Sequence, residues 1–336
     1  VEGVAAQGGI PRFVTLLTST SMQAQAYAAA VLAIVCQSSD ENHRAVLASG
    51  CVPLLVQMLT QGGFAEARAE AAAALANLSM DREKTGVAQR EVVGAGAVQP
   101  LVELLHVDHS RAQRKSAVAL MHLAADNRAH QDAVRLAGGI QRLVNLLSDT
   151  GREDVQAAGA AALAELASGN KENQTAIADV DGLPRLVRLL QKASMDRAVE
   201  AASASLRRLA AGNSANQIMI AAYGGILPLI LKLGSGNEMI QAETAEALAN
   251  LANKNEDNEA TIATLLIKLL FDRATAARGA RVIANLGAQL GTPFQNAVAR
   301  FGGLHALATL LTPEPLLTAD GQPDRSEGGT SVVMLQ

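Results

Sequence analysis

Apolar and polar segments recur along the chain in blocks of roughly 43 residues. A block contains a small or Gly-Gly pair, an aliphatic anchor that Pro often follows, and a short apolar run that ends in paired aliphatic residues. The steps between successive anchors are 42, 46, 42, 43, 43 and 78 residues for Ile10, Val52, Val98, Ile140, Leu183, Ile226 and Leu304. A period near 40 residues predicts an array of stacked helical repeats.

Three helices are predicted in each block. A short first helix ends at the Gly pair, because Gly adopts at low cost the left-handed conformation that closes a helix. The second helix begins near the Pro, which the first helical turn tolerates, and a longer Ala-rich third helix follows a polar loop. Aliphatic pairs three residues apart end the third helix and share one buried face. These pairs are Leu75 and Leu78, Leu120 and Leu123, Leu163 and Leu166, Leu206 and Leu209, Leu248 and Leu251, and Ile283 and Leu286.

The last step is nearly two periods long, which predicts a degenerate block inside it. Residues 258–263 are similar to residues 173–178, and the apolar run 265–270 follows them without a Gly-Gly turn. The first helix of this seventh block therefore cannot turn in the usual way. We expect this block to form the weakest joint of the array.

These signals divide the chain into about eight units and a tail. The predicted units lie near 1–39, 40–81, 82–126, 127–169, 170–213, 214–254, 255–289 and 290–311, and the first and last are incomplete. Residues 312–336 are expected to form a flexible tail, because 312–330 are rich in Pro, Gly, Asp, Glu and Ser. A solenoid needs a polar cap at its end, and none precedes Val1, so we expect the chain to be a piece of a longer protein.

The motifs resemble the armadillo repeat. The resemblance rests on the Gly8-Gly9-Ile10-Pro11 turn, the Leu248-Ala249-Asn250-Leu251 ending and the Asn173-to-Ile177 spacing in a first helix, and it covers roughly residues 1–311. It implies an all-α, right-handed α-solenoid of three-helix repeats whose third helices line a concave groove.

Composition and charge narrow the functional classes. The formal net charge is -4 and aromatic residues supply 2% of the chain, with no Trp. A nucleic-acid binder normally shows a basic footprint or aromatic stacking platforms, so no nucleic-acid partner is expected. The longest uncharged apolar stretch, 218–231, is too short to span a bilayer. Two Cys residues are too few for a disulfide framework and favour a reducing compartment. We therefore expect a cytoplasmic protein that reaches the cytoskeleton or a membrane only through its partners.

Candidate binding residues follow from the resemblance. In armadillo proteins an Asn near the end of the third helix binds the main chain of an extended peptide, and the corresponding residues here are Ile34, Asn77, His122, Glu165, Arg208, Asn250 and Asn285. Because only three of these seven residues are Asn, an extended peptide held by its backbone alone is not expected. Importin-type members place a Trp one turn earlier, where this chain has Ala30, Ala73, Val118, Ala161, Ala204, Glu246 and Arg281. A nuclear-import adaptor is therefore disfavoured.

Charged residues replace the interrupted Asn series, and their sign alternates from unit to unit. The groove-facing residues are predicted to be Arg111, Lys115 and His122, then Asp154 and Glu165, then Arg197 and Arg208, then Glu243 and Glu246, then Arg278 and Arg281. One interpretation is a groove matched to a partner segment of mixed charge. The other is that neighbouring units neutralise each other through exposed ion pairs. The sequence leaves both open.

No catalytic or metal-binding arrangement is predicted, and no cofactor is expected. The densest titratable cluster, His106, Asp108 and His109, lies in a predicted loop without further ligands nearby. The sequence therefore favours a non-enzymatic scaffold or adaptor that binds a protein segment in the groove. The alternatives are a structural subunit of a large assembly, such as a ciliary or membrane-associated scaffold, and the targeting module of a larger enzyme such as a ubiquitin ligase. The oligomeric state stays open.

Overall fold

The computed structural model describes residues 8–311 except 62–63, 81–84, 149–150 and 272–275. Within these residues every regular element is an α-helix, so the predicted all-α fold class is confirmed. The predicted tail, 312–336, lies outside the described residues.

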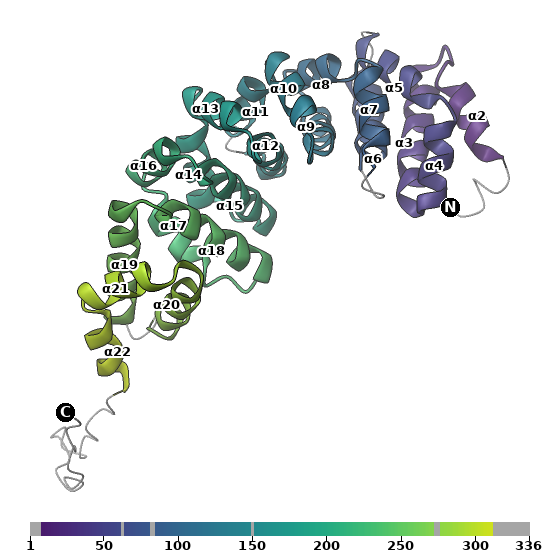
Figure 1. The fold of residues 1–336 in the computed structure, drawn as a ribbon. Coiled ribbons are helices and arrows are strands. Elements are labelled where there is room, and N and C mark those ends of the chain that lie inside the picture. The colour runs from purple at the N-terminus through teal and green to yellow at the C-terminus, as the bar shows by residue number, and fades with distance from the viewer. Residues whose placement is uncertain (1–7, 62–63, 81–84, 149–150, 272–275, 312–336) are drawn as a thin grey trace, which may run out of the picture. The chain divides into compact units, whose positions relative to one another are not determined.

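The helices follow the expected order of a first, a second and a third helix in each repeat (Figure 1). The first repeat contributes α2 (Gly9–Leu16) and α3 (Met22–Ser38). The complete repeats are α4 (Asp40–Ala48), α5 (Cys51–Thr60) and α6 (Ala65–Leu78); α7 (Val87–Gly94), α8 (Val98–Leu104) and α9 (Ser110–Ala124); α10 (Arg128–Leu136), α11 (Gly139–Leu146) and α12 (Glu153–Ala167); α13 (Lys171–Asp179), α14 (Gly182–Lys192) and α15 (Asp196–Ala210); and α16 (Ser214–Ala222), α17 (Ile226–Lys232) and α18 (Glu238–Ala252).

The seventh repeat departs from this order. Helix α19 (Glu256–Phe271) runs for 16 residues without interruption, where the complete repeats have two separate helices. This is the helix in which the sequence lacks the Gly-Gly turn. The chain separates into two compact parts, residues 1–262 and residues 263–336, and the division falls within α19. The second part also contains α20 (Ala276–Leu290), α21 (Thr292–Arg300) and α22 (Gly303–Leu311), and Ile267, Leu270 and Ala306 form a core cluster there.

The Gly-Gly pair has two separate functions, which the fourth repeat illustrates. Gly138 has a φ of 79°, a left-handed conformation that L side chains rarely adopt. Gly139 lies against the preceding helix, and a Cβ there would be 2.9 Å from the Val134 carbonyl oxygen. The first position tolerates a short polar residue, since Asp181 occupies it in the fifth repeat with a φ of 61°. At the second position the close contact favours glycine in the fourth repeat, whereas Cys51 and Ala97 occupy it in the second and third repeats.

The third helices form the continuous core of residues 1–262. Helices α3, α6, α9, α12, α15 and α18 pack in succession, each against the next. The five aliphatic pairs predicted to be buried in residues 1–262 are buried, and Leu75, Leu78, Leu120 and Leu123 have no exposed surface. In the sixth pair, Leu286 is buried and Ile283 is partly buried. Small side chains let neighbouring helix axes approach closely. This explains how a chain with so few aromatic residues fills its core.

Buried glutamines on the first helices connect the ends of successive third helices. Gln174 Nε2 lies 3.3 Å from the Ala167 carbonyl oxygen in one repeat, and 2.9 Å and 3.4 Å from the Arg208 and Ala211 carbonyl oxygens in the next. Its Oε1 accepts from Asn213 Nδ2 at 3.1 Å. Because the last carbonyls of a helix lack intrahelical partners, these contacts satisfy them. We call this set of residues the glutamine latch; its other members are Gln89, Gln131 and Gln217.

Candidate functional site

Seven of the residues predicted to bind a partner lie on the third helices of residues 1–262. Asn77, His122, Glu165, Arg208 and Asn250 stand at corresponding positions on α6, α9, α12, α15 and α18, and all five are half-buried. Lys115 on α9 is half-buried and Glu246 on α18 is exposed. Arg281 is an exposed residue of α20 in the second part of the chain. The side chain of Asn285 lies outside the described part of the structure.

Three of these residues donate hydrogen bonds to the preceding third helix. Asn77 Nδ2 donates to the Ala33 carbonyl at 2.8 Å, and Asn250 Nδ2 donates to the Arg207 carbonyl at 3.0 Å. His122 Nδ1 lies 2.7 Å from the Ala76 carbonyl oxygen, an arrangement that requires the proton on Nδ1. Burial, the larger effect, lowers the pKa of His122 although this carbonyl raises it, so the ring is neutral.

The predicted Asn series thus serves first as a connection between repeats. The Asn77 and Asn250 side chains each use one of their two Nδ2 hydrogens in this connection, so in the described contacts one hydrogen of each is left for a peptide carbonyl, at about 1 kcal/mol net for each bond. Binding of a partner's main chain there stays a prediction.

Charged residues of the face pair across neighbouring repeats. Arg208 Nη1 lies 3.0 Å from Glu165 Oε1, and Arg114 Nε lies 3.4 Å from Asp154 Oδ2. Arg207, which the sequence did not single out, contacts Glu243 at 2.7 Å and Glu246 at 3.1 Å. Arg111 pairs with Glu66 and Glu70. The alternation of sign therefore neutralises neighbouring repeats at these positions, as the second of the two interpretations proposes.

A hollow of about 310 Å³ interrupts this face between α9 and α15. Its floor consists of small apolar residues, among them Val118, Ala161 and Ala204, which occupy the positions where importin-type members have Trp. The other lining residues are Arg114, Met121, Asp154, Ala157, Ala158, Ala164, Glu165, Arg197, Glu200, Ala201, Arg208 and Glu243. The residue pattern could not reveal this hollow, because its lining residues come from four helices that are far apart in the sequence.

Three charged residues in or beside the hollow have no ion-pair partner among the described residues. Arg197 is exposed, and Glu200 and Lys115 are half-buried. Burial, the first cause, and the neighbouring Arg114 lower the pKa of Lys115. The hollow thus combines an apolar floor with unpaired charges of both signs at its edge.

The described residues contain no cluster of three or more His, Cys, Asp or Glu side chains that could hold a metal ion. Cys36 and Cys51 are buried free thiols, and desolvation raises the pKa of Cys51, which disfavours the reactive thiolate. In the part of the chain described, no single helix has the length and apolarity to cross a bilayer; α16 and α17 meet these criteria only jointly, with an 82° bend between them.

Comparison with known proteins agrees with this architecture. The model of the Armadillo/beta-catenin-like repeat matches residues 39–80 and 88–125. The U-box domain-containing protein 12 of Arabidopsis thaliana is 30% identical over 97 residues, which are 29% of this chain and 14% of that protein.

Solved structures match over longer stretches. An engineered protein is 33% identical with a TM-score of 0.73, over 91% of this chain and 74% of its own. A designed armadillo repeat protein is 28% identical with a TM-score of 0.65, over 72% of this chain and 99% of its own. Another, in complex with the peptide (KR)4, is 25% identical with a TM-score of 0.63, over 72% of this chain and 99% of its own.

Proposed function

The chain belongs to the armadillo-repeat family, and from that premise we propose that it is a scaffold that holds a segment of a partner protein against the hollow of its third-helix face. The fold typically serves as a binding scaffold, and a designed relative of this architecture binds a peptide. The single observation that carries the proposal is the hollow itself, a cavity of about 310 Å³ whose lining is rich in Ala and comes from α9, α12, α15 and α18.

The chemistry of the hollow indicates the kind of segment. Its Ala-rich floor accepts a large apolar side chain, whose full burial contributes about 1.5–3 kcal/mol. The unpaired Arg197 and Glu200 at its edge fit a segment that carries both an acidic and a basic residue near that side chain. A uniformly basic peptide, such as the one bound by the designed relative, does not match this mixture.

The test fills the hollow with a large side chain introduced at one of its lining positions. Ala204→Trp places an indole among the residues that line the hollow, one helical turn before Arg208. Ala30→Trp is the matched control, because it makes the same change at the corresponding repeat position, outside the hollow. Peptides would first be selected on the wild-type chain from a random display library, and their affinities measured by fluorescence polarisation. We expect selected peptides to share a large apolar residue, and Ala204→Trp to weaken them roughly tenfold to hundredfold.

Ala30→Trp should leave the same affinities within about twofold, since no contact of the hollow changes. Circular dichroism must show both variants folded. Unchanged binding to folded Ala204→Trp would contradict the proposal. Charge reversal of Arg208 is a poorer test, because it would leave Glu165 without its partner.

A second candidate function is the targeting module of a larger enzyme, which the match to a U-box domain-containing protein favours. A targeting module would bind its partner through the same third-helix face as a scaffold. The two functions differ only in whether the chain is joined to a catalytic domain. Transfer of ubiquitin to the selected partner by the full-length gene product, in a reconstituted reaction, would establish it. A cytoplasmic location is part of the proposal, supported by the two buried free thiols.

A further inference from the structure

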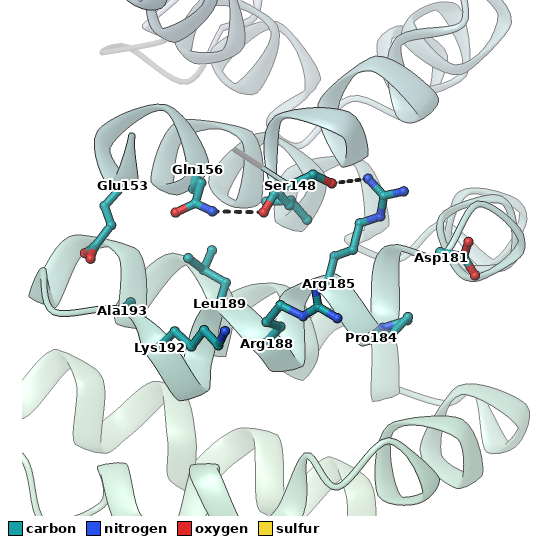
Figure 2. A pocket seen from close by; sticks show the side chains of 11 residues that line it. Ser148, Glu153, Gln156, Asp181, Pro184, Arg185, Arg188, Leu189, Lys192 and Ala193 are labelled. Carbon is teal, nitrogen blue, oxygen red and sulfur yellow. Dashed lines mark hydrogen bonds between the residues drawn. The ribbon is translucent and has the colours of Figure 1, made fainter. Parts of the chain in front are cut away.

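A second cavity lies among the second helices of the fourth and fifth repeats. It measures about 410 Å³ and is bounded by the end of α11, the start of α12 and the length of α14 (Figure 2). Helix α12 separates it from the hollow, because Glu153 and Gln156 line this cavity whereas Asp154 and Ala157 line the hollow. The two sites are therefore built from different surfaces.

Basic residues dominate one wall of this cavity. Arg185, Arg188 and Lys192 follow one another along α14 at helical spacing (Figure 2). Arg185 is occupied, since it donates to the Ser148 hydroxyl and, at 3.4 Å, to the Val144 carbonyl. Arg188 and Lys192 are exposed and have no hydrogen-bond or ion-pair partner among the described residues. Two cations one helical turn apart thus face the cavity unpaired.

The carboxylates that line the cavity form no ion pair with these cations among the described residues. Glu153 accepts from the Met195 and Ser194 main-chain nitrogens at 2.8 Å and 3.0 Å, and from Ser194 Oγ at 2.9 Å. These bonds lower the pKa of Glu153, and the bond from the Met195 main chain has the largest effect. The carboxylate of Glu153 is therefore bound to the loop before α15. Asp181 stands in the left-handed turn before α14. The lining carries the three cations Arg185, Arg188 and Lys192 against the two carboxylates Glu153 and Asp181, so its net charge is +1 in a chain whose net charge is -4.

The basic wall is a property of one repeat and not of the fold. At the position of Arg188 the other complete repeats carry Gln57, Glu103, Asn145 and Leu231. A residue that stabilised every second helix would recur, whereas this one does not.

We propose that this cavity binds an acidic segment of a partner protein that presents two carboxylates roughly 6 Å apart, the rise of four helical residues. One carboxylate pairs with the guanidinium of Arg188, which favours planar bidentate contacts, and the other with the Lys192 ammonium. The occupant is a peptide segment because the cations are spread along a helix rather than gathered around one point. This site extends the proposed scaffold function to a second, independent docking position.

The test uses a fluorescein-labelled octaglutamate peptide and fluorescence polarisation on the full chain. At about 50 mM salt, where charges are weakly screened, the wild type should bind and Arg188→Glu/Lys192→Glu should bind at least tenfold more weakly. Lys171→Glu/Lys254→Glu is the matched control, because it changes the net charge by the same amount at two exposed lysines outside the cavity. The control should bind within about twofold of the wild type.

Three results would overturn the proposal. Equal loss in both double variants would show general charge attraction, and unchanged binding in Arg188→Glu/Lys192→Glu would show that the cavity is not the site. Displacement of octaglutamate by inorganic phosphate at constant ionic strength would show a phosphate site instead. The outcome is separable from the scaffold proposal, because Ala204→Trp should leave octaglutamate binding unchanged.

Discussion

Replacement of Gln174 by Leu tests whether the glutamine latch holds the repeats together. The side chain is 2% exposed, and its carboxamide lies between the ends of α12 and α15. Leucine keeps much of the volume and removes every hydrogen bond. The carbonyls of Ala167, Arg208 and Ala211 would then lose their side-chain donor.

The magnitude follows from the number of bonds. A carboxamide nitrogen has two hydrogens, so the three carbonyls share two donated bonds, and Oε1 accepts one more from Asn213. At about 1 kcal/mol net for each bond, Gln174→Leu should lower the free energy of unfolding by about 3 kcal/mol. Gln174→Glu should cost more, because a carboxylate would face the negative ends of two helices.

Urea denaturation followed by circular dichroism measures the change, with native-state hydrogen exchange at the end of α15 as a local readout, since repeat arrays can unfold in stages. Gln141→Leu is the control; Gln141 is exposed and donates only to Asn145, so its loss should change stability by less than about 0.5 kcal/mol. A Gln174→Leu variant as stable as the control would refute the latch.

The remaining predictions concern the seventh repeat and pH. Glu259 stands where other repeats have the latch glutamine, and its buried Oε1 has no hydrogen-bond partner among the described residues. In Glu259→Gln the new amide should donate to the Ala252 carbonyl. The free energy of unfolding, measured by urea denaturation, should rise by about 1 kcal/mol. Burial lowers the pKa of both His122 and His130 in the folded chain below the ordinary 6.5. As the pH falls, these histidines therefore bind protons more readily in the unfolded chain than in the folded chain. Their contribution to the free energy of unfolding should be fully present above pH 6.5 and should be lost as the pH falls through the lowered pKa values of the folded chain. Other repeats carry Asn at both positions, so the double replacement of these histidines by Asn should reduce the change in urea midpoint between pH 7.5 and 5.5. An unchanged pH dependence of the midpoint would contradict the role given to the two histidines.

The sequence predicted the repeat architecture because one residue pattern enforces one geometry in every unit. The Gly-Gly pair marks the turn between first and second helices, and its absence before Leu265 correctly indicated an unusual seventh repeat, which the structure shows as the uninterrupted α19. The aliphatic pairs that end the third helices were predicted as core for the same reason, and Leu206 and Leu209 are fully buried.

Contacts between repeats could not be predicted in the same way. The alternating charges left two interpretations open, because pairing depends on whether neighbouring third helices bring Glu165 and Arg208 within reach, and the sequence does not contain that distance. The glutamine latch was missed altogether, although Gln131, Gln174 and Gln217 recur at a constant step of 43 residues. That recurrence of a polar residue at a buried helix position was the signal that could have revealed it.

The internal pairing of the third-helix face has a consequence for recognition. Asn77 and Asn250 already donate to main-chain carbonyls of the array, and Arg208 already has its carboxylate. A ligand gains little by replacing such bonds, and a main-chain contact to the second Nδ2 hydrogen of an Asn adds only about 1 kcal/mol net. We therefore expect most of the affinity to come from apolar burial in the hollow and from the few charges that have no ion-pair partner among the described residues. Selectivity would then depend on the side chains of a partner rather than on its extended main chain, which is the reverse of recognition by an uninterrupted Asn series.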